Sequence, residues 1–442
     1  MTDALHTLPA GWTETRLDRV ATVNARIGWK ALTAAEYQTD GYAFLATPNI
    51  KNSEIDFTNV NYISEFRYNE SPELKLQVGD VLLTKDGNTL GIVNIVRQLP
   101  RAATVNGSIA VLRAFDMEPR FLRYVIQSSF IQEHINSVKE GMGVPHLFQR
   151  DIKRFALPAP PIQEQHRIAD FLDAEVARID DLVTALQREL DLLAERRTAG
   201  VVAAVSGSGH KDRRPSTLAW LNSVPNTWQE VRVGLLARMG SGHTPSRSHP
   251  EWWKDCHIPW ITTGEVKQVR DDRVEDLYDT REKISQLGLA NSAAELHPKG
   301  TVFLCRTASA GYSGVMGLDM ATSQDFVTWT CGPRLFPYYL LWCLRAMRPD
   351  LLGRLAMGST HKTIYVPDLQ MLRIPLPSMD EQKQIVNTIR RQSGHSDKLT
   401  DKVRRQQELL CERRQAVITA AVTGQFDVST ASGRNVTEGV TA

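Results

Sequence analysis

Polar side chains that can hydrogen-bond to a ligand gather in turn-rich segments that follow short β-prone runs. Arginine and lysine hydrogen-bond to guanine edges, asparagine and glutamine bond to adenine, and serine or threonine hydroxyls hold phosphates. The densest segments are 84–89 and 306–313. The candidate binding residues are Lys51, Asn52, Lys85, Asn88, Thr89, Asn106 and Ser108 in the first half, and Lys267, Arg306, Ser309, Tyr312, Ser313, Gln324, His361 and Lys362 in the second half. An ordinary solvated loop explains any single residue equally well, so the prediction concerns the loops as groups.

Catalytic motifs do not accompany these loops. Methyl transfer to adenine needs an Asn/Asp-Pro-Pro-aromatic motif, whereas the Pro-Pro pair at Pro160 and Pro161 is flanked by alanine and isoleucine. The sequence has no Gly-x-x-x-x-Gly-Lys-Ser/Thr loop that would cradle nucleotide phosphates. The glycines around Ser313 lack the Gly-x-Ser-x-Gly spacing of a nucleophile elbow. We therefore predict a protein without catalytic residues and without a bound cofactor.

Histidines and cysteines give no metal site and point to a reducing compartment. His243, His249, Cys256 and His257 match no usual zinc spacing, so local packing or phosphate contact is favoured over metal binding. The five cysteines are odd in number and scattered, which is typical of reduced proteins. No apolar run approaches the ~18 residues of a membrane span, and the first ten residues lack a secretory pattern. These features predict a cytoplasmic protein with no membrane association.

The loops are carried by an internal repeat. Residues 158–207 align without a gap on residues 375–424, with 18 identities in 50 positions. The same register continues upstream, where Leu147 and Phe148 meet Ile364 and Tyr365. The chain therefore reads as a variable half, a helix, a second variable half and a second helix.

The repeated segments have the signals of long helices. Each follows a proline-rich stretch and carries a glutamate in its first turn, Glu164 or Glu381. Gly207 and Gly424 are predicted C-caps, and a break is expected where serine and glycine interrupt the second helix at Ser393. Apolar residues recur at coiled-coil spacing. The predicted helix contact comprises Leu182, Leu186, Leu190 and Leu193 with Leu399, Val403 and Leu410, and it is looser where Ser396 and Gln407 replace Ile179 and Leu190.

Short β-prone runs separated by turns dominate the two halves, and a short helix is expected near the end of each. The predicted fold is α+β, with two α/β domains and two long helices that belong to an internal repeat. The predicted boundaries are 1–157 for the first domain, 158–207 for the first helix, 208–375 for a linker and the second domain, 376–424 for the second helix, and 425–442 for a flexible tail.

The chain resembles the specificity subunits of type I restriction-modification systems over nearly all of residues 8–424. The resemblance rests on the motif Pro158-Ala-Pro-Pro-Ile-Gln-Glu-Gln165, its second copy with Glu381 and Gln382, and two helices that end in Glu-Arg-Arg and a C-terminal glycine. One such motif is weak evidence, but two copies at a fixed offset, each after a domain-sized half, are strong evidence.

This resemblance implies two target-recognition domains that each read one half of a split site in double-stranded DNA, which makes the candidate binding residues of the loops predicted DNA contacts. It also implies that the two long helices pack antiparallel between the domains, with pseudo-twofold symmetry. It further implies that the helices set the spacer and recruit two copies of a methyltransferase (modification) subunit, which motor-nuclease (restriction) subunits then join. S-adenosylmethionine, ATP and Mg²⁺ would belong to those partners. The alternatives are a coiled-coil adaptor that binds only protein, which leaves the loop-rich halves unexplained, and a stand-alone DNA-modifying enzyme, which lacks its motifs.

Overall fold

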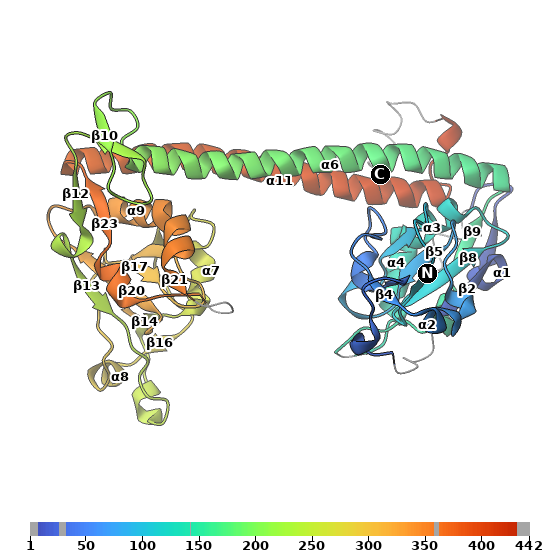
Figure 1. The fold of residues 1–442 in the computed structure, drawn as a ribbon, viewed down its shortest axis with the longest axis horizontal. Coiled ribbons are helices and arrows are strands. Elements are labelled where there is room, and N and C mark those ends of the chain that lie inside the picture. Colours follow the sequence, from blue (N-terminus) through green and yellow to red (C-terminus); the bar gives the residue numbers. More distant parts are fainter. Residues whose placement is uncertain (1–7, 26–31, 142, 358–361, 431–442) are drawn as a thin grey trace. The chain divides into compact units, whose positions relative to one another are not determined.

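The computed structural model describes residues 8–25, 32–141, 143–357 and 362–430. The chain divides into two compact units (Figure 1). Unit 1 consists of residues 1–186 together with residues 405–442, and unit 2 is the continuous segment 187–404. Each unit therefore contains one half of the repeat and a stretch of both long helices. No helix among the described residues is long and apolar enough to cross a membrane.

Unit 1 is built on two small sheets and a strand pair. The four-stranded antiparallel sheet has the order β2 (Ala21–Ala25), β8 (Ile109–Ala114), β5 (Val81–Thr84) and β6 (Val93–Ile95). The three-stranded sheet has the order β4 (Asn61–Ile63), β3 (Tyr42–Leu45) and β7 (Ala103–Val105). The antiparallel pair comprises β1 (Thr13–Arg16) and β9 (Ala156–Ala159).

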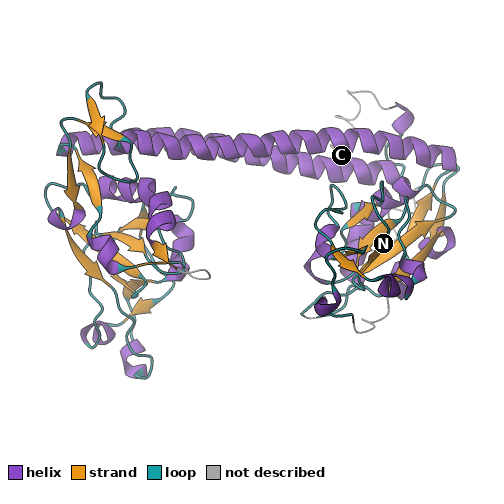
Figure 2. Ribbon diagram, viewed as in Figure 1, coloured by secondary structure: helices purple, strands orange, loops and turns teal. Residues whose placement is uncertain are grey.

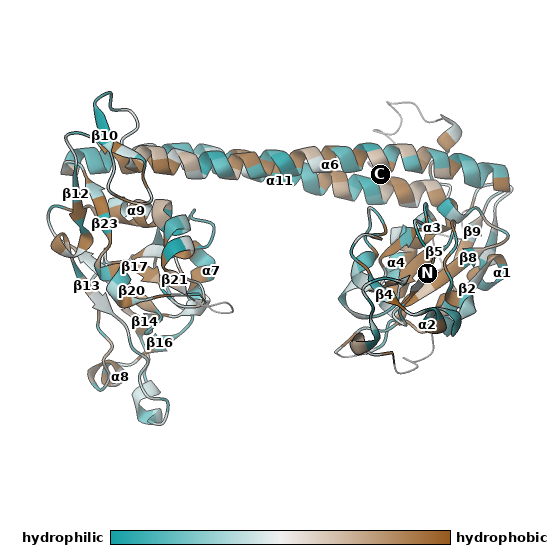
Figure 3. Ribbon diagram, in the orientation of Figure 1, coloured by the Kyte–Doolittle hydropathy of each residue, from teal (hydrophilic) through white to brown (hydrophobic). Residues whose placement is uncertain are grey.

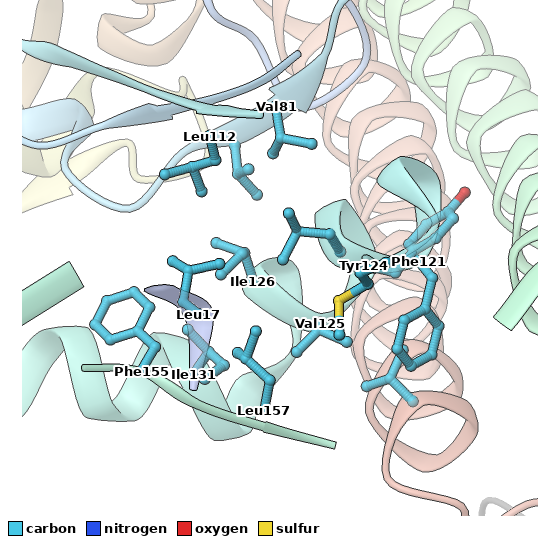
Figure 4. Close-up of a cluster of buried hydrophobic side chains, with 14 of the residues drawn as sticks. Leu17, Val81, Leu112, Phe121, Tyr124, Val125, Ile126, Ile131, Phe155 and Leu157 are labelled. Atoms are coloured by element: carbon cyan, nitrogen blue, oxygen red, sulfur yellow. The ribbon is translucent and has the colours of Figure 1, made fainter. Parts of the chain in front are cut away.

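The core of unit 1 lies between the four-stranded sheet and the helices. Its short helices are α1 (Leu17–Val20), α2 (Glu65–Asn69), α3 (Pro119–Gln127), α4 (Ser129–Val138) and α5 (Gln149–Ile152). Figure 4 shows Val81 and Leu112 of the sheet above Val125 and Ile126 of α3, all fully buried or nearly so. Ile168 from the first long helix and Val417, Ile418 and Val422 from the second join the same cluster.

Unit 2 repeats this design with an additional edge strand. The five-stranded sheet has the order β13 (Ala237–Ser241), β20 (Phe326–Cys331), β17 (Val302–Cys305), β18 (Ser313–Met316) and β15 (Asp276–Leu277). The three-stranded sheet has the order β16 (Lys283–Ile284), β14 (Ile258–Ile261) and β19 (Ala321–Thr322). The strand pairs are β12 (Gln229–Arg232) with β23 (Arg373–Leu376), β10 (Arg213–Pro215) with β11 (Ser223–Pro225), and β21 (Ala356–Met357) with β22 (Thr363–Ile364). In both units the three-stranded sheet contains one parallel pair, β3 with β7 and β14 with β19.

The core of unit 2 is again closed by a helix on the larger sheet. The helices are α7 (Val266–Val269), α8 (Gln286–Ala290), α9 (Pro337–Asp350) and α10 (Val366–Gln370). The helix α9 buries Leu340, Leu341 and Leu344 against Trp329 of β20. The α+β fold with two related domains is confirmed.

The two long helices are α6 (Ile162–Val205) and α11 (Met379–Val422) (Figure 2). Hydrophobic and hydrophilic residues alternate along both (Figure 3), as expected for helices with one buried stripe. Within unit 1 they run antiparallel, and Arg413 lies 3.3 Å from Glu175. Within unit 2 the antiparallel arrangement recurs, and Arg197 lies 3.1 Å from Asp397.

A buried glutamine fixes the start of α6. Gln165 is 4% exposed, and its side-chain oxygen accepts a hydrogen bond from the backbone N–H of Glu118 at 2.9 Å. Its amide nitrogen donates to the carbonyl of Pro160 at 2.8 Å. Because Glu118 caps α3, this one side chain ties the long helix to the domain that precedes it.

The second copy of the motif makes the same connection. Gln382 is fully buried, accepts a hydrogen bond from the N–H of Phe336 at 2.8 Å, and donates to the carbonyls of Arg334 and Pro377 at 3.0 Å. Its neighbour Glu381 accepts a hydrogen bond from the indole N–H of Trp228. The repeated Glu-Gln pair is therefore structural in unit 2, where it holds the helix against the domain.

The predicted glycine caps are confirmed. Gly207 has a φ of +66° and Gly424 has a φ of +75°, a region that glycine adopts without steric cost. A side chain at Gly207 would meet Trp228, and one at Gly424 would meet Pro9 within 3 Å. The end of each long helix therefore packs against the start of a domain, Gly207 in unit 2 and Gly424 in unit 1.

Two details of the helix prediction are wrong. The helix α11 continues through Ser393 and Gly394, because the buried Ser393 and the nearby ion pair between Arg197 and Asp397 support a segment whose glycine costs only about 1 kcal/mol. Leu182 is 46% exposed rather than part of the helix contact, whereas Ile179 is 2% exposed. The apolar stripe therefore passes beside Leu182.

Candidate nucleic-acid interface

Three segments meet where β5 ends in unit 1. The backbone N–H of Lys85 donates to the carbonyl of Ser108, and the N–H of Leu147 donates to the carbonyl of Lys85, both at 2.8 Å. Asp86 forms a backbone bridge with His146 on the same segment. We refer to residues 84–91, 106–108 and 145–147 as the loop junction of unit 1.

The same arrangement recurs where β17 ends in unit 2. The N–H of Arg306 donates to the carbonyl of Asp325 at 2.7 Å, and the N–H of Ile364 donates to the carbonyl of Arg306 at 2.8 Å. Thr307 forms a bridge with Thr363. We refer to residues 305–312, 323–325 and 362–364 as the loop junction of unit 2. Because the hydrogen bonds match one for one, Lys85 and Arg306 occupy equivalent positions.

Glycines return each loop to its strand. Gly91 has a φ of +92° and donates to the carbonyl of Thr84, and Gly311 has a φ of +87° and donates to the carbonyl of Cys305. Burial raises the pKa of the Cys305 thiol to about 12. The thiol therefore stays protonated at neutral pH, and it donates to the carbonyl of Thr307 at 3.2 Å.

The side chains of the unit 1 junction are partly paired with one another. Lys85 is only 7% exposed, and its ammonium lies 3.4 Å from the carboxylate of Asp86. Asp86 also bonds to the ring nitrogen Nδ1 of His146. Asn88 is exposed, whereas Thr89 is half-buried and accepts a hydrogen bond from Thr84 at its carbonyl. The side chains available to a ligand at this loop are therefore Asn88 and His146 rather than Lys85.

The remaining predicted residues of unit 1 divide into two groups. Asn106 and Ser108 belong to the junction, where the side-chain oxygen of Asn106 accepts from the N–H of Ser108 at 3.1 Å. Lys51 and Asn52 are exposed on a separate turn, whose carbonyls accept from the amide of Asn94 on β6. The ammonium of Lys51 lies 3.1 Å from Asp56. No hydrogen bond among the described residues links this turn to the junction.

The unit 2 junction presents a more open basic surface. The guanidinium of Arg306 donates through Nε to the carbonyl of Gln324 at 3.0 Å, and the side chain of Gln324 accepts from Thr244 at 2.6 Å. Gln324 and Lys362 are both exposed. The structure therefore brings together Arg306, Gln324 and Lys362, three of the residues predicted from the sequence. His361 lies outside the described residues.

Other predicted residues of unit 2 have different surroundings. Ser313 is fully buried, so its prediction as a DNA contact is wrong: β18 is an inner strand of the sheet, and all four of its residues are buried. The ring of Tyr312 lies 5.3 Å from the guanidinium of Arg270 and 4.6 Å from that of Arg348. Ser309 is half-buried on the loop, and Lys267 is exposed on α7.

Three residues of the junctions were missed by the sequence interpretation. His146 and Asp86 in unit 1 and Thr244 in unit 2 face the loops through side-chain hydrogen bonds. A signal for His146 was present, because the repeat register that aligns Leu147 with Ile364 also places His146 opposite Thr363. Thr244 lies in the motif Gly242-His-Thr-Pro-Ser246, which also resembles the family, but nothing in the sequence places its hydroxyl beside Gln324.

The described residues contain no group of three or more histidine, cysteine or acidic side chains that could hold a metal ion. The junctions offer hydrogen-bond donors and acceptors on loops that are held by backbone bonds. That arrangement suits recognition of base edges and phosphates.

Comparison with known proteins gives one consistent family. The family model for the type I restriction modification DNA specificity domain matches residues 9–192 and again residues 225–406. The StySPI type I restriction enzyme specificity subunit of Salmonella potsdam is 25% identical over 95% of this chain and 90% of its own length. A chain from a structure of the type I R-M system has a TM-score of 0.67 at 19% identity and covers 95% of this chain and 100% of its own. The HsdS subunit from Thermoanaerobacter tengcongensis has a TM-score of 0.52 at 20% identity and covers 96% of this chain and 100% of its own.

Proposed function

The chain belongs to the family defined by the type I restriction-modification DNA specificity domain, and from this premise we propose that each unit reads one half of a split DNA site. The observation that supports the proposal is the duplicated loop junction. Two copies of the same backbone framework present different side chains, Asn88 and His146 in unit 1 and Arg306, Gln324 and Lys362 in unit 2. Two such surfaces on one chain suit two unrelated half-site sequences.

The long helices have two proposed roles. They belong to both units, so they set the number of unspecified base pairs between the half-sites. With the adjoining domain surfaces they bind two copies of a modification subunit, and motor-nuclease subunits join that assembly. The chain itself supplies binding and no catalytic group; S-adenosylmethionine, ATP and Mg²⁺ belong to the partner subunits. We place this assembly in the cytoplasm, where host DNA is accessible and the five cysteines, all free, stay reduced.

The experiment is methylome sequencing of cells that express the chain with its modification subunit. We expect a split motif with methylated adenines, and each junction should control one half of it. Arg306→Ala with Lys362→Ala should relax one half-site, and Asn88→Ala with His146→Ala should relax the other. A lost bidentate contact costs about 1–3 kcal/mol, enough to lose selectivity at one position.

The control is the half-site that the other junction reads, which should remain unchanged in each variant. Uniform loss of methylation at every sequence would show that these residues hold phosphates, and base reading by the junctions would then be rejected. Methylation of a continuous motif by the wild type would contradict the split-site proposal.

A further inference from the structure

Unit 2 has an apolar groove beside the strand pair of β12 and β23. Its volume is about 540 Å³, and Leu235 and Met371 stand on its walls. Leu235 is 76% exposed, the highest value among the exposed large hydrophobic side chains of the described residues, and Met371 is 59% exposed. Because both side chains line the same groove, they offer a partner a small apolar contact area.

Three arginines surround these apolar residues without a carboxylate partner. Arg232, Arg334 and Arg373 are exposed, and none forms an ion pair with a described residue. Arg373 donates only to the carbonyl of Glu230 at 2.7 Å, and Arg232 contacts the sulfur of Met371. The carboxylate of Glu230 is occupied, because it accepts from Ser216 and Thr217 and lies 3.4 Å from Arg214. The groove therefore carries uncompensated positive charge.

The matching face of unit 1 also carries exposed arginines but lacks the two apolar side chains. In the repeat register Leu235 corresponds to Arg19 and Met371 to Arg154. Arg334 corresponds to Asp116, because each lies two residues before the residue whose N–H donates to the buried glutamine, Phe336 or Glu118. Arg16, the counterpart of Arg232, forms an ion pair with Asp18 at 2.6 Å. The fold thus tolerates charged residues at these positions, so the apolar groove is not a requirement of packing.

The residues that line the groove indicate which kind of partner it can bind. Figure 1 shows β12 and β23 on the opposite side of unit 2 from β21 and α7, which lie near the loop junction. Phosphates would satisfy the arginines but not the two aliphatic side chains between them. A protein segment with carboxylates on either side of an aliphatic or aromatic residue satisfies both, and arginine is enriched in such contacts.

We propose that this groove docks an acidic, apolar segment of the modification subunit. The inference rests on the proposed function, which makes the modification subunit the protein in direct contact with the chain. It adds that the contact on unit 2 contains an arginine-rimmed apolar groove and that the contact on unit 1 does not.

The experiment is titration of the full chain with purified modification subunit, followed by native mass spectrometry of the complexes at low and high salt. The variant carries Leu235→Ser, Arg232→Glu and Arg334→Glu. The matched control carries Arg16→Glu, Arg19→Glu and Arg154→Glu on unit 1. We expect the unit 2 variant to bind one of the two modification subunits about tenfold more weakly, with the difference shrinking as salt rises. The control should change that affinity by less than about twofold.

A photo-crosslinking residue at position 235 gives a second readout that does not depend on the charge-reversed variant folding. In the assembled complex it should attach to a peptide of the modification subunit that contains aspartate or glutamate, whereas the same residue at position 19 should not attach to that peptide. Binding by the unit 2 variant equal to the wild type, or crosslinking of position 235 to DNA, would overturn the inference and leave the proposed function intact. Failure of the wild type to bind modification subunit would overturn both.

Discussion

Units 1 and 2 use the same backbone hydrogen bonds to hold different side chains at their loop junctions. The equivalent hydrogen bonds of Lys85 and Arg306 involve main-chain atoms only. Each residue donates its backbone N–H and accepts a bond at its backbone carbonyl. Their side chains then diverge, since Lys85 is buried beside Asp86 while Arg306 reaches the carbonyl of Gln324. Because the framework does not depend on side-chain identity, the loops can change their chemistry without a change of fold.

The long helices also differ between the two units: they align without a gap, but a buried isoleucine in unit 1 is replaced by a serine in unit 2. In unit 1, Ile179 is buried, with only 2% of its surface exposed. In unit 2 the equivalent position is Ser396, and a cavity of about 420 Å³ lies there, lined by both helices near Gly200 and Leu399. The hydroxyl of Ser396 is buried without a hydrogen-bond partner. The cavity agrees with the looser packing predicted at Ser396. We therefore expect the helix pair to be less stable in unit 2 than in unit 1.

Introducing the serine of unit 2 at the equivalent position of unit 1 should have the largest effect on the free energy of unfolding. Ile179→Ser removes a buried aliphatic side chain and leaves a hydroxyl in its place, which should destabilise unit 1 by about 2–5 kcal/mol. Hydrogen exchange followed by mass spectrometry should show faster exchange in the core of unit 1, while unit 2 serves as the internal control. Unchanged protection in unit 1 would mean that Ile179 does not pack in solution as described.

Replacing either of the two buried glutamines at the helix starts should lower the free energy of unfolding by a similar, intermediate amount. Gln165→Ala and Gln382→Ala each leave a buried backbone N–H and a carbonyl without their partner, at a cost of about 1–3 kcal/mol. Each variant should lose protection only in its own unit. Exposed Gln163→Ala is a suitable control, and a large effect of Gln382→Ala alone would show that the two connections are not equivalent.

Introducing the isoleucine of unit 1 at the equivalent position of unit 2 should have the smallest effect on the free energy of unfolding. Ser396→Ile fills part of the cavity and removes the unpartnered hydroxyl, so it should stabilise unit 2 by about 0.5–2 kcal/mol. Slower exchange confined to residues 187–205 and 379–404 would support this expectation. Destabilisation would indicate that the cavity is too narrow for the extra carbon atoms.

The repeat and the long helices could be predicted because their signals are local. Proline, glycine and apolar spacing lie in one stretch of sequence, and the glycines after the helices have the positive φ that a C-cap needs. The continuity of α11 through Gly394 could not be predicted, because it depends on tertiary contacts such as the one between Arg197 and Asp397. Local propensity and packing oppose each other there, and packing prevails.

The loop segments were predictable as groups but not residue by residue. Arg306, Gln324 and Lys362 come together as expected for one surface, whereas Ser313 turns into the core one residue after Tyr312. Which side chain faces outward depends on where the strand begins, and sequence patterns place such boundaries only approximately. The pairing of His146 with Asp86 depends on a contact between distant loops.

The division of the chain into a continuous unit 2 and a discontinuous unit 1 has a consequence for biosynthesis. The core of unit 1 includes Val417, Ile418 and Val422, which are translated after the whole of unit 2. Unit 2 can therefore finish folding first, while Ile168 and Leu172 of the nascent chain remain without their partners. A ribosome that stops before residue 405 would release a folded second half attached to an open first half. The first domain of such a truncated chain would expose the apolar face that Val417, Ile418 and Val422 otherwise cover.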